Sequence, residues 1–465
     1  MLLGRFREMK VLQESFGRSD FQMTVVYGRR RIGKSNMITE FLKGKRSSYY
    51  IATKAPLAEN LKNWAEQFIG DLDLPFSGVT FESFEKFFQF MAQVCKEERT
   101  IIALDEIPYI AETDESFLSI FQKGIDTYLS KSNIYLIVCG SAVSFMEKEV
   151  LSEKSPLFGR RTNQIFLKPF DFKESALFVP NYTAEEKMIA YGVTGGVAKY
   201  LSLFDDSKSL DENLIDNFFK TSGYLYEEPS NLLSQEFRNV SAYNSVIAVC
   251  SNGANKVNEI ADKAHISTAL LSYILKSLQT VGIISKISAI TDEKNKKKTK
   301  YEITDGLYRF WYRFIPAARA SIEMGRGEKY YYANVKPRLH EFMGGVFERI
   351  CREHTLNLGL EGRLNCPVTS VGTWWGTNRD RTQTDIDVVG IDEVAKKAVL
   401  GECKFTNEPI DKDVYDALFD RKGLIDSRYS EVQFLFFSLS GFSKWMQEES
   451  DKEQVKLISV EEMYE

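Results

Sequence analysis

The segment YGRRRIGKS, residues 27–35, constrains the fold of this chain more than any other feature. It has the spacing G-x-x-x-x-G-K-[ST], and it lies between a β-rich run, MTVVY, and a helix-compatible run, NMITEFLKG. Glycines in this spacing let backbone N–H groups surround phosphate oxygens, the start of the helix adds positive potential, and lysine reaches the outer phosphates. The sequence therefore predicts a P-loop that binds a nucleotide on a parallel α/β sheet.

A second motif supplies the carboxylates that a magnesium nucleotide site needs. The apolar run TIIALDE, residues 100–106, ends in Asp105 and Glu106. We expect Asp105 to complete the shell of a Mg²⁺ ion that the Ser35 hydroxyl also binds, and Glu106 to polarise the attacking water. Acids at a strand end are common by themselves, but the loop upstream favours the catalytic interpretation. The residues expected to contact the nucleotide are Gly28, Arg29, Arg30, Arg31, Ile32, Gly33, Lys34, Ser35 and Asn36, and Lys34 is also expected to be catalytic.

Short apolar runs alternate with amphipathic stretches over the first 170 residues, which is the pattern of a parallel α/β sheet. Two of the runs are almost continuously apolar, as expected of central strands that are covered on both faces. The expected strands are residues 23–28, 48–53, 100–106, 134–141 and 163–170.

These motifs, with IVCGSAVSFM at 137–146 and the helical segment after the sheet, resemble the AAA+ and STAND branches of the P-loop proteins. The resemblance implies that Ser141 takes the sensor position near the γ-phosphate. The segment SPLFGRRTNQIFLKPF resembles the one that carries the family's arginine. Arg160 or Arg161 is therefore a candidate finger or sensor, and a plain surface arginine pair is the alternative.

Two further segments bear on the choice of nucleotide. LLGRFREMKVL is similar to the family's opening G-R-x-x-E box through Gly4, Arg5 and Glu8, which implies a place near an adenine. YGVTGGVAKYL, residues 191–201, resembles the family's GG-x-P-x-Y-L stretch, with Ala198 where proline is usual. The guanine motif N-K-x-D is absent from the sequence. ATP is therefore expected rather than GTP.

The middle of the chain has the pattern of a winged helix-turn-helix. Residues 255–287 combine two helical patterns with a short turn around His265, and GIISKISAI and KTKYEITD would form the strands of the wing. The tip between these strands, TDEKNKKKTK, has five lysines against two acids. Such a wing suits a phosphate backbone, but it is equally compatible with a solvated hairpin or a protein contact. The second helix offers only Lys276 toward bases, so sequence-specific readout is not expected.

Near the C-terminus, the stretch GECKF places Glu402 and Lys404 on one face of an expected strand. TDIDVVGID, with Asp385 and Asp387, precedes it across a short connection, so Asp387 is expected beside Glu402 and Lys404 on the next strand. This is the arrangement of PD-(D/E)XK nucleases, in which two carboxylates bind Mg²⁺ and the lysine stabilises the attacking hydroxide. Glu348, on the helix expected at 340–354, is the candidate outer metal ligand. A surface hairpin with a salt bridge is the alternative.

YEITDGLYRFWYRFI, FERICREH, TDIDVVG and GECKF together look like the domain of unknown function 234, which is fused to prokaryotic P-loop ATPases of archaeal type and is grouped with restriction-endonuclease-like folds. The resemblance spans nearly the whole chain through the order of its domains. The residues that match are Asp305, Phe310, Trp311, Arg313, Phe314, Glu348, Asp387, Glu402 and Lys404. The resemblance implies the fold, whereas such folds can also lack cleavage activity.

Composition narrows the remaining classes. The 465 residues carry a net charge of −5, which argues against a globally basic surface. Six scattered cysteines form no CxxC pair, and three dispersed histidines are too few for a histidine-built zinc site. There is no run of eighteen apolar residues and no signal-peptide pattern at the start of the sequence, so a cytoplasmic location without a membrane partner is expected.

The sequence thus predicts a multidomain α/β protein: a P-loop ATPase core at 1–170, a helical lid at 171–235, a winged helix at 236–315 and a restriction-endonuclease-like domain at 316–465. The expected activity is hydrolysis of ATP with Mg²⁺, acting on DNA or RNA without strong sequence specificity. The alternative is a nucleotide-dependent switch or scaffold that binds a protein partner, with a silent nuclease fold. A homo-oligomer is compatible with either.

Overall fold

The computed structural model describes residues 2–76, 78–237, 239–292, 298–450 and 454–465. Two compact units are formed. The first consists of the chain up to Phe170 together with Val197–Lys199, and the second consists of Asp171–Gly196 and Tyr200–Glu465. The division of the second unit into lid, winged helix and nuclease-like domain stays a prediction, and one helix, α16 (Gly306–Glu323), crosses the boundary expected at residue 315.

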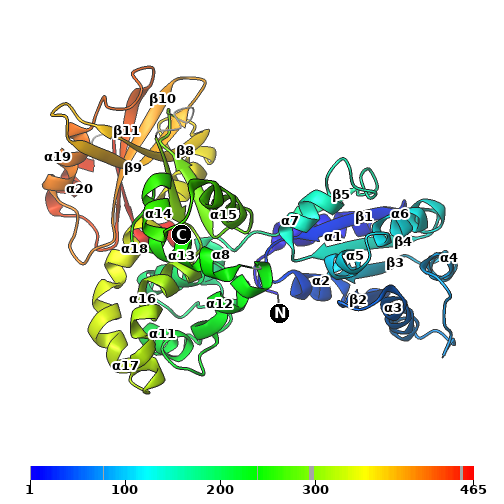
Figure 1. The fold of residues 1–465 in the computed structure, drawn as a ribbon. Coiled ribbons are helices and arrows are strands. Elements are labelled where there is room, and N and C mark those ends of the chain that lie inside the picture. Colours follow the sequence, from blue (N-terminus) through cyan, green and yellow to red (C-terminus); the bar gives the residue numbers. More distant parts are fainter. Residues whose placement is uncertain (1, 77, 238, 293–297, 451–453) are drawn as a thin grey trace. The chain divides into compact units, whose positions relative to one another are not determined.

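The first unit is built on a five-stranded parallel sheet in the order β2-β3-β4-β1-β5 (Figure 1). Every residue of β1, β3 and β4 is buried, because each of these strands has neighbours on both sides and helices on both faces. The strands expected from the sequence are confirmed to within a few residues at their ends. Their bounds are β1 Gln22–Tyr27, β2 Ser47–Ile51, β3 Thr100–Asp105, β4 Ile134–Gly140 and β5 Asn163–Phe166.

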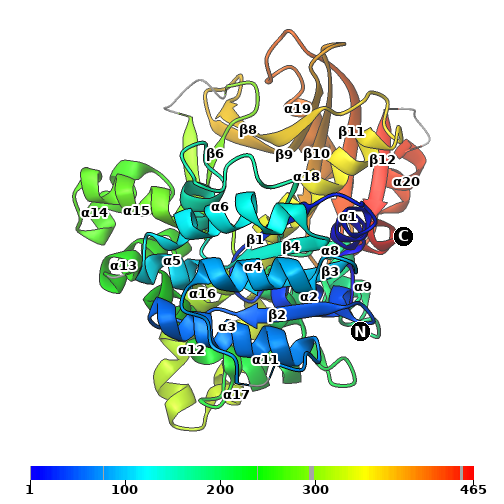
Figure 2. The same cartoon turned by 90° about the vertical axis from the view of Figure 1, so that its right-hand side faces the viewer.

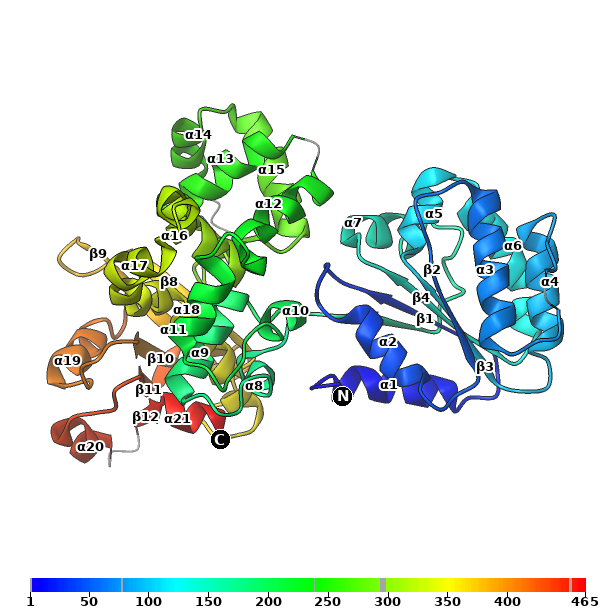
Figure 3. The same ribbon diagram turned by 90° about the horizontal axis from the view of Figure 1, so that it is seen from below.

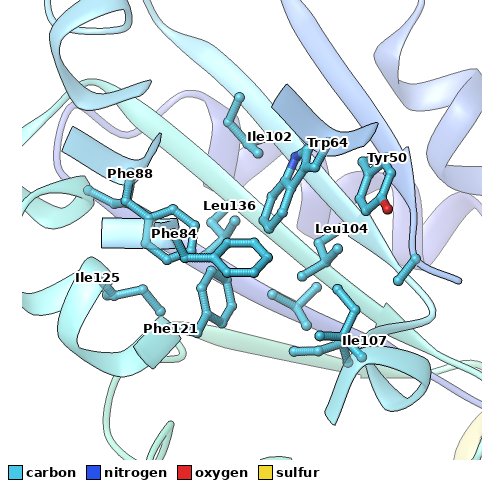
Figure 4. Packing of buried hydrophobic residues seen from close by; sticks show 14 of the residues in the cluster. Tyr50, Trp64, Phe84, Phe88, Ile102, Leu104, Ile107, Phe121, Ile125 and Leu136 are labelled. Carbon is cyan, nitrogen blue, oxygen red and sulfur yellow. The ribbon is translucent and has the colours of Figure 1, made fainter. Parts of the chain in front are cut away.

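Helices cover both faces of this sheet (Figure 3). On one face, Trp64, Phe88 and Phe121 point toward one another and toward Leu104 and Leu136 of the sheet (Figure 4). The helices on this face are α3 Leu57–Asp71, α4 Phe84–Val94, α5 Ile107–Thr113 and α6 Phe117–Thr127. On the other face, α1 (Phe6–Phe16) and α2 (Lys34–Leu42) pack on strand residues such as Val26 and Ile137.

The second unit begins with short helices, and capping residues in the sequence mark where three of them start. Asp171, Thr183 and Ser209 each form a capping box with a glutamate three residues later. Gly195, with φ 62°, ends α9, and its backbone lies so close to that of Gly306 that a Cβ on either residue would clash. The helices are α8 Phe172–Ala176, α9 Ala184–Thr194, α11 Leu210–Phe218 and α12 Tyr224–Glu236, whereas α10 (Ala198–Leu201) begins in the part of the chain that belongs to the first unit and ends in the second.

Three helices and an antiparallel hairpin follow, where the sequence predicts the helix-turn-helix and its wing. His265, with φ 52°, ends α14, and the Ser267 hydroxyl caps α15. Of the apolar residues on α15, Leu271 and Ile274 are buried, whereas Leu270 is 40% exposed. The bounds are α13 Val240–Ser251, α14 Val257–Ala264, α15 Thr268–Thr280, β6 Ile284–Ser288 and β7 Thr299–Ile303.

A second five-stranded sheet, in the order β12-β11-β10-β9-β8, forms the C-terminal part. The strands β8, β9 and β10 are antiparallel neighbours, and β11 and β12 add to β10 in parallel. The long helix α18 packs across β8, β9 and β10 (Figure 2). The elements are α17 Gly327–Tyr330, α18 Leu339–Leu360, β8 Ser370–Thr377, β9 Gln383–Asp392, β10 Lys397–Lys404, α19 Lys412–Asp420, β11 Ser430–Ser438, α20 Lys444–Ser450, β12 Val455–Ser459 and α21 Val460–Tyr464.

The hairpin β6–β7 lies against this second sheet. The backbone N–H of Ile290 donates to the Thr373 carbonyl at 2.9 Å, and the Lys300 ammonium lies 4.3 Å from the ring centre of Trp375. Lys298 pairs with Asp292 at 2.6 Å. Of the tip lysines, for which the sequence leaves nucleic-acid contact, solvent and protein contact open, Lys298 and Lys300 contact protein groups. Lys294, Lys296 and Lys297 lie outside the described residues.

Among the described residues, no helix combines the length and the apolar character that crossing a bilayer requires.

Candidate nucleotide site and C-terminal carboxylate site

The phosphate loop begins where β1 ends, and the structure explains its first glycine. Gly28 has φ 155°, and a Cβ at this position would clash with the carbonyl oxygen of Leu167. Leu167 is held there because its N–H donates to the Tyr27 carbonyl at 2.7 Å. Gly33, with φ 96°, precedes α2, which begins at Lys34. The expected order of strand, glycine loop and helix is present.

Lys34 lies along the loop. Its ammonium group donates to the carbonyl oxygens of Gly28 at 2.9 Å and Arg29 at 3.0 Å, and the side chain is 6% exposed. The ammonium is therefore surrounded by loop backbone, at the position from which a P-loop lysine reaches phosphate oxygens.

Ser35 and Asp105 meet as the sequence predicts. The Ser35 hydroxyl, at the first turn of α2, donates to Asp105 Oδ2 at 2.6 Å. The Tyr49 hydroxyl, from the neighbouring strand β2, donates to the same oxygen at 2.6 Å. Burial and the Asp105 carboxylate raise the pKa of Tyr49 well above its usual range, so Tyr49 stays a hydrogen-bond donor. A serine hydroxyl and a carboxylate in contact are the oxygen ligands that Mg²⁺ prefers.

Glu106 and Ser141 also lie together, because β3 and β4 are parallel neighbours and their carboxyl ends meet at one edge of the sheet. The backbone N–H and the hydroxyl of Ser141 both donate to Glu106 Oε2, at 3.1 and 3.0 Å. Glu106 itself has φ 54°, an uncommon conformation for a residue with a side chain. The Glu106 carboxylate, at the end of β3, is thus held by Ser141 at the end of the neighbouring strand β4.

Other side chains brace the loop. Arg5 donates to the Ile32 carbonyl at 3.2 Å, and its guanidinium lies 3.8 Å from the ring centre of Phe170. Arg30 donates to the Tyr109 hydroxyl at 3.1 Å. The Arg31 carbonyl accepts a 3.1 Å hydrogen bond from the backbone of Lys199, in the segment that resembles GG-x-P-x-Y-L.

The two finger candidates are engaged elsewhere in this conformation. Arg160 forms a two-pronged ion pair with Asp126 on α6, at 3.1 and 2.8 Å, and Arg161 donates to the Leu151 carbonyl at 2.8 Å. Their role toward a nucleotide stays a prediction.

In the C-terminal sheet, β9 and β10 pair in antiparallel register, with Val388 opposite Gly401. Continued by one residue, this register would place Asp387 opposite Glu402, and the backbone N–H of Cys403, which follows Glu402, donates to Asp387 Oδ2 at 2.9 Å. Along β10, Ala398 and Leu400 pack into the core shared with α19 and α20, and Glu402 and Lys404 continue on the same face. This face of the strand thus changes from a hydrophobic core to a charged site.

Glu402 is 5% exposed and is neutralised on both oxygens. Its Oε1 accepts from the Lys404 ammonium at 2.8 Å, and its Oε2 accepts from Arg421 at 2.5 Å. These two ion pairs offset the desolvation cost of burying the Glu402 carboxylate. Sequence reasoning missed Arg421, which lies just after α19 and has no local signal that connects it to GECKF.

Asp387 lacks such neutralisation. Its Oδ2 accepts the backbone N–H of Cys403 at 2.9 Å, but burial, then Glu402 and then Glu348 raise its pKa from 3.8 to about 8. Glu348 lies on α18 and forms a 3.6 Å ion pair with Arg352, and burial raises its pKa.

The predicted metal ligands of this site are not assembled for a metal ion. In the described part of the chain, no three His, Cys, Asp or Glu side chains form a group that could hold one. The charges of Glu402 and Glu348 raise the pKa of Asp387, yet Glu402 is occupied by two cations. In this conformation the residues do not fit a divalent ion.

The sheet, the loop and the paired side chains define the first unit as a P-loop NTPase. Comparison with known proteins is more specific. Residues 2–204 match a family described as an ATPase domain predominantly from Archaea, and residues 311–415 match a family of archaeal and bacterial proteins of unknown function. The chain is therefore similar to the archaeal ATPase family over residues 2–204 and to the second family over residues 311–415, which confirms the resemblance found in the sequence.

Two relatives extend this result. A protein of Methanocaldococcus jannaschii is 28% identical over 432 residues, which are 91% of this chain and 92% of that protein. The solved structure of a Walker-type ATPase of Pyrococcus abyssi has a TM-score of 0.51 at 19% identity and covers 67% of this chain and 96% of that one. The second likeness shows a shared fold.

Proposed function

We propose that the first unit binds ATP with Mg²⁺ and hydrolyses it. The observation that carries this proposal is the 2.6 Å hydrogen bond between Ser35 and Asp105 at the start of the helix that follows the phosphate loop. These residues fit a hard cation, which Ser35 and Asp105 would hold and which would neutralise charge on the phosphates.

The remaining roles are assigned to the chain's own groups. Lys34 would exchange the loop carbonyls for phosphate oxygens, since its ammonium already lies within the loop. Glu106 would orient the attacking water through Oε1, while Ser141 holds Oε2. Arg5, in the segment whose resemblance implies a place near an adenine, donates to the Ile32 carbonyl of the phosphate loop, and the absence of N-K-x-D from the sequence favours ATP over GTP.

The test is ATP binding and hydrolysis by the full chain and three variants. Lys34→Ala should lose nucleotide binding. Glu106→Gln should still bind ATP, but its turnover should fall about a hundredfold or more because the general base is gone. Ser141→Ala should bind normally with a smaller loss of turnover. Normal turnover by Glu106→Gln, or equal competition by GTP, would contradict the proposal.

A second candidate function, cleavage of nucleic acid, rests on one placement. The hairpin β9–β10 brings Asp387, Glu402 and Lys404 to one end of the second sheet. The helices α13–α15 with their hairpin would contribute nonspecific contact to DNA or RNA, although Lys298 and Lys300 already contact protein groups. We derive no metal-dependent step, because the carboxylates do not fit an ion as they are arranged.

Cleavage is tested with single- and double-stranded DNA and RNA, Mg²⁺ or Mn²⁺, and with or without ATP. Products that disappear in Lys404→Ala would support the nuclease, and dependence on Lys34 would indicate gating by nucleotide. If no substrate is cut while ATP is hydrolysed, the alternative is favoured: a nucleotide-dependent switch that binds a protein partner.

A further inference from the structure

Two arginines of the second unit, Arg309 and Arg349, lie on different helices and have no carboxylate in contact. Arg309 belongs to α16 and Arg349 to α18, and both side chains are partly buried. Among the described residues, neither guanidinium forms an ion pair or donates a hydrogen bond. A charged group that is partly withdrawn from water is ordinarily paired, so this arrangement calls for a counter-ion.

The backbone of α18 leaves room for Arg309. A Cβ on Gly345 would lie only 2.7 Å from Nη2 of Arg309, and the guanidinium is 5.6 Å from the ring centre of Phe342. Arg349 follows Gly345 by four residues and therefore lies one turn further along the same face of α18. Beside them, a Cβ on Gly344 would meet nothing within 4 Å. The two arginines thus lie next to an open stretch of helix backbone.

The charges of Arg309 and Arg349 are close enough to act on each other. Burial, and next the charge of Arg349, lowers the pKa of Arg309 to about 10, so its guanidinium is still charged at neutral pH. Glu302 and Glu348 act in the opposite direction, but neither forms an ion pair with Arg309, and Glu348 pairs with Arg352 at 3.6 Å. No ion pair within the described part of the chain therefore relieves the repulsion between the two arginines.

We propose that Arg309 and Arg349 bind a phosphate group between them. Each guanidinium offers N–H donors in a plane, which suits phosphate oxygens, and the bare backbone at Gly344 and Gly345 lets the group approach closely. The phosphate belongs either to a nucleic-acid strand or to free phosphate. This site requires no metal ion, and it depends neither on nucleotide binding by the phosphate loop nor on cleavage at the C-terminal carboxylates.

The test is titration of the full chain with inorganic phosphate, followed by calorimetry. Every chain carries Lys34→Ala, so that the phosphate loop contributes little to the signal. Arg309→Gln and Arg349→Gln should each weaken phosphate binding about tenfold, because each removes charge-assisted hydrogen bonds. The matched control is Arg338→Gln, which should bind as the parent chain does, because Arg338 is exposed just before α18 begins.

A graded series at Arg349 separates recognition of charge from loss of packing. Arg349→Lys keeps the charge without the planar group and should retain more phosphate binding than Arg349→Gln. Arg349→Glu places a negative charge beside Arg309 and should abolish the binding, because it takes the place of the anion. Equal affinities across the series would show that no anion is held by this side chain and would overturn the proposal.

Competition with a short single-stranded DNA identifies the source of the phosphate. Displacement of phosphate by this DNA, with the same dependence on Arg349, assigns the site to a nucleic-acid strand, whereas phosphate that binds and is not displaced assigns it to free phosphate. Phosphate binding that is absent, or that is unchanged in both Arg309→Gln and Arg349→Gln, overturns the proposal. Thermal unfolding checks that each variant is folded, and the Arg349 series decides alone if Arg309→Gln does not fold.

Discussion

Gly28 shows how one residue sets the geometry of the nucleotide site. Its left-handed φ and its close approach to Leu167 leave no room for a Cβ. We predict that Gly28→Ala costs about 2–4 kcal/mol of stability and abolishes ATP binding, because the loop must move away from β5. Equilibrium unfolding and nucleotide titration check both results.

The matched control is Gly70→Ala. Gly70 lies within α3, and a Cβ there meets nothing within 4 Å. This change should stabilise the chain by about 0.5–1 kcal/mol and leave ATP binding unchanged, because alanine restricts the unfolded chain and suits a helix. A Gly28→Ala protein that binds ATP normally would show that the contact with Leu167 is not what shapes the loop.

The sequence predicted the residues of the nucleotide site whose spacing is local, and it missed those brought in by neighbouring strands. Lys34, Ser35, Asp105 and Glu106 lie in two short motifs with a known chemical logic. Tyr49 contacts Asp105 only because β2 pairs with β3, and no pattern within the β2 segment predicts which strand lies next to it. Arg421 was missed for the same reason, since the distance in sequence between it and Glu402 gives no hint of contact.

At the scale of elements, helix α18 carries a buried histidine that should make stability depend on pH. His354 is 5% exposed and lies against the rings of Phe172 and Phe437. Burial, followed by the charges of Lys173 and Arg363, lowers its pKa from 6.5 to about 4. Below about pH 6.5 the unfolded chain takes up a proton that the folded chain does not, so stability falls as the pH drops toward 4, by at most about 3 kcal/mol.

His354→Phe keeps a ring in this position and removes the titration. We predict that its stability falls less steeply between pH 6.5 and 4 than that of the natural sequence, as measured by urea unfolding at several pH values. His265→Asn is the control, because His265 is exposed at the end of α14 and asparagine tolerates its left-handed conformation. Equal slopes for the natural sequence and His354→Phe would assign the acid sensitivity to other groups.

Helices and strands with a clear hydrophobic periodicity were predicted well, whereas the contacts between elements were not. The five strands of the first sheet and the strands around TDIDVVGID and GECKF follow from apolar runs and alternation. The contact of the β6–β7 hairpin with β8 could not be predicted, since a lysine-rich tip reads as solvated or as a ligand for phosphate. In the structure, the ammonium groups of Lys298 and Lys300 lie against the rings of Trp374 and Trp375.

The whole molecule consists of two compact units, and we expect two thermal transitions. ADP with Mg²⁺ should raise only the transition of the first unit, because a ligand stabilises the unit that binds it. At a hundredfold excess over Kd the gain is about 2.7 kcal/mol, which corresponds to roughly 5–10 °C for a unit of this size. Scanning calorimetry measures both transitions.

Lys34→Ala should remove this shift and leave the other transition in place. A single transition that moves as a whole with ADP would mean that the two units unfold together.

The position of Val197–Lys199 shows that the segment matched by the ATPase family and the first compact unit do not have the same boundaries. The stretch that matches the archaeal ATPase family extends to residue 204, whereas the continuous part of the compact unit ends at Phe170. After Phe170 the chain forms α8 and α9 in the second unit, and Val197–Lys199 then belong to the first unit again. The backbone N–H of Lys199 donates to the carbonyl of Arg31 in the phosphate loop. A gene fragment that stops at Phe170 would therefore encode the complete first sheet but lack the residues whose backbone supports the phosphate loop. Transfer of the whole first unit to another protein by recombination therefore requires the segment with α8 and α9 as well.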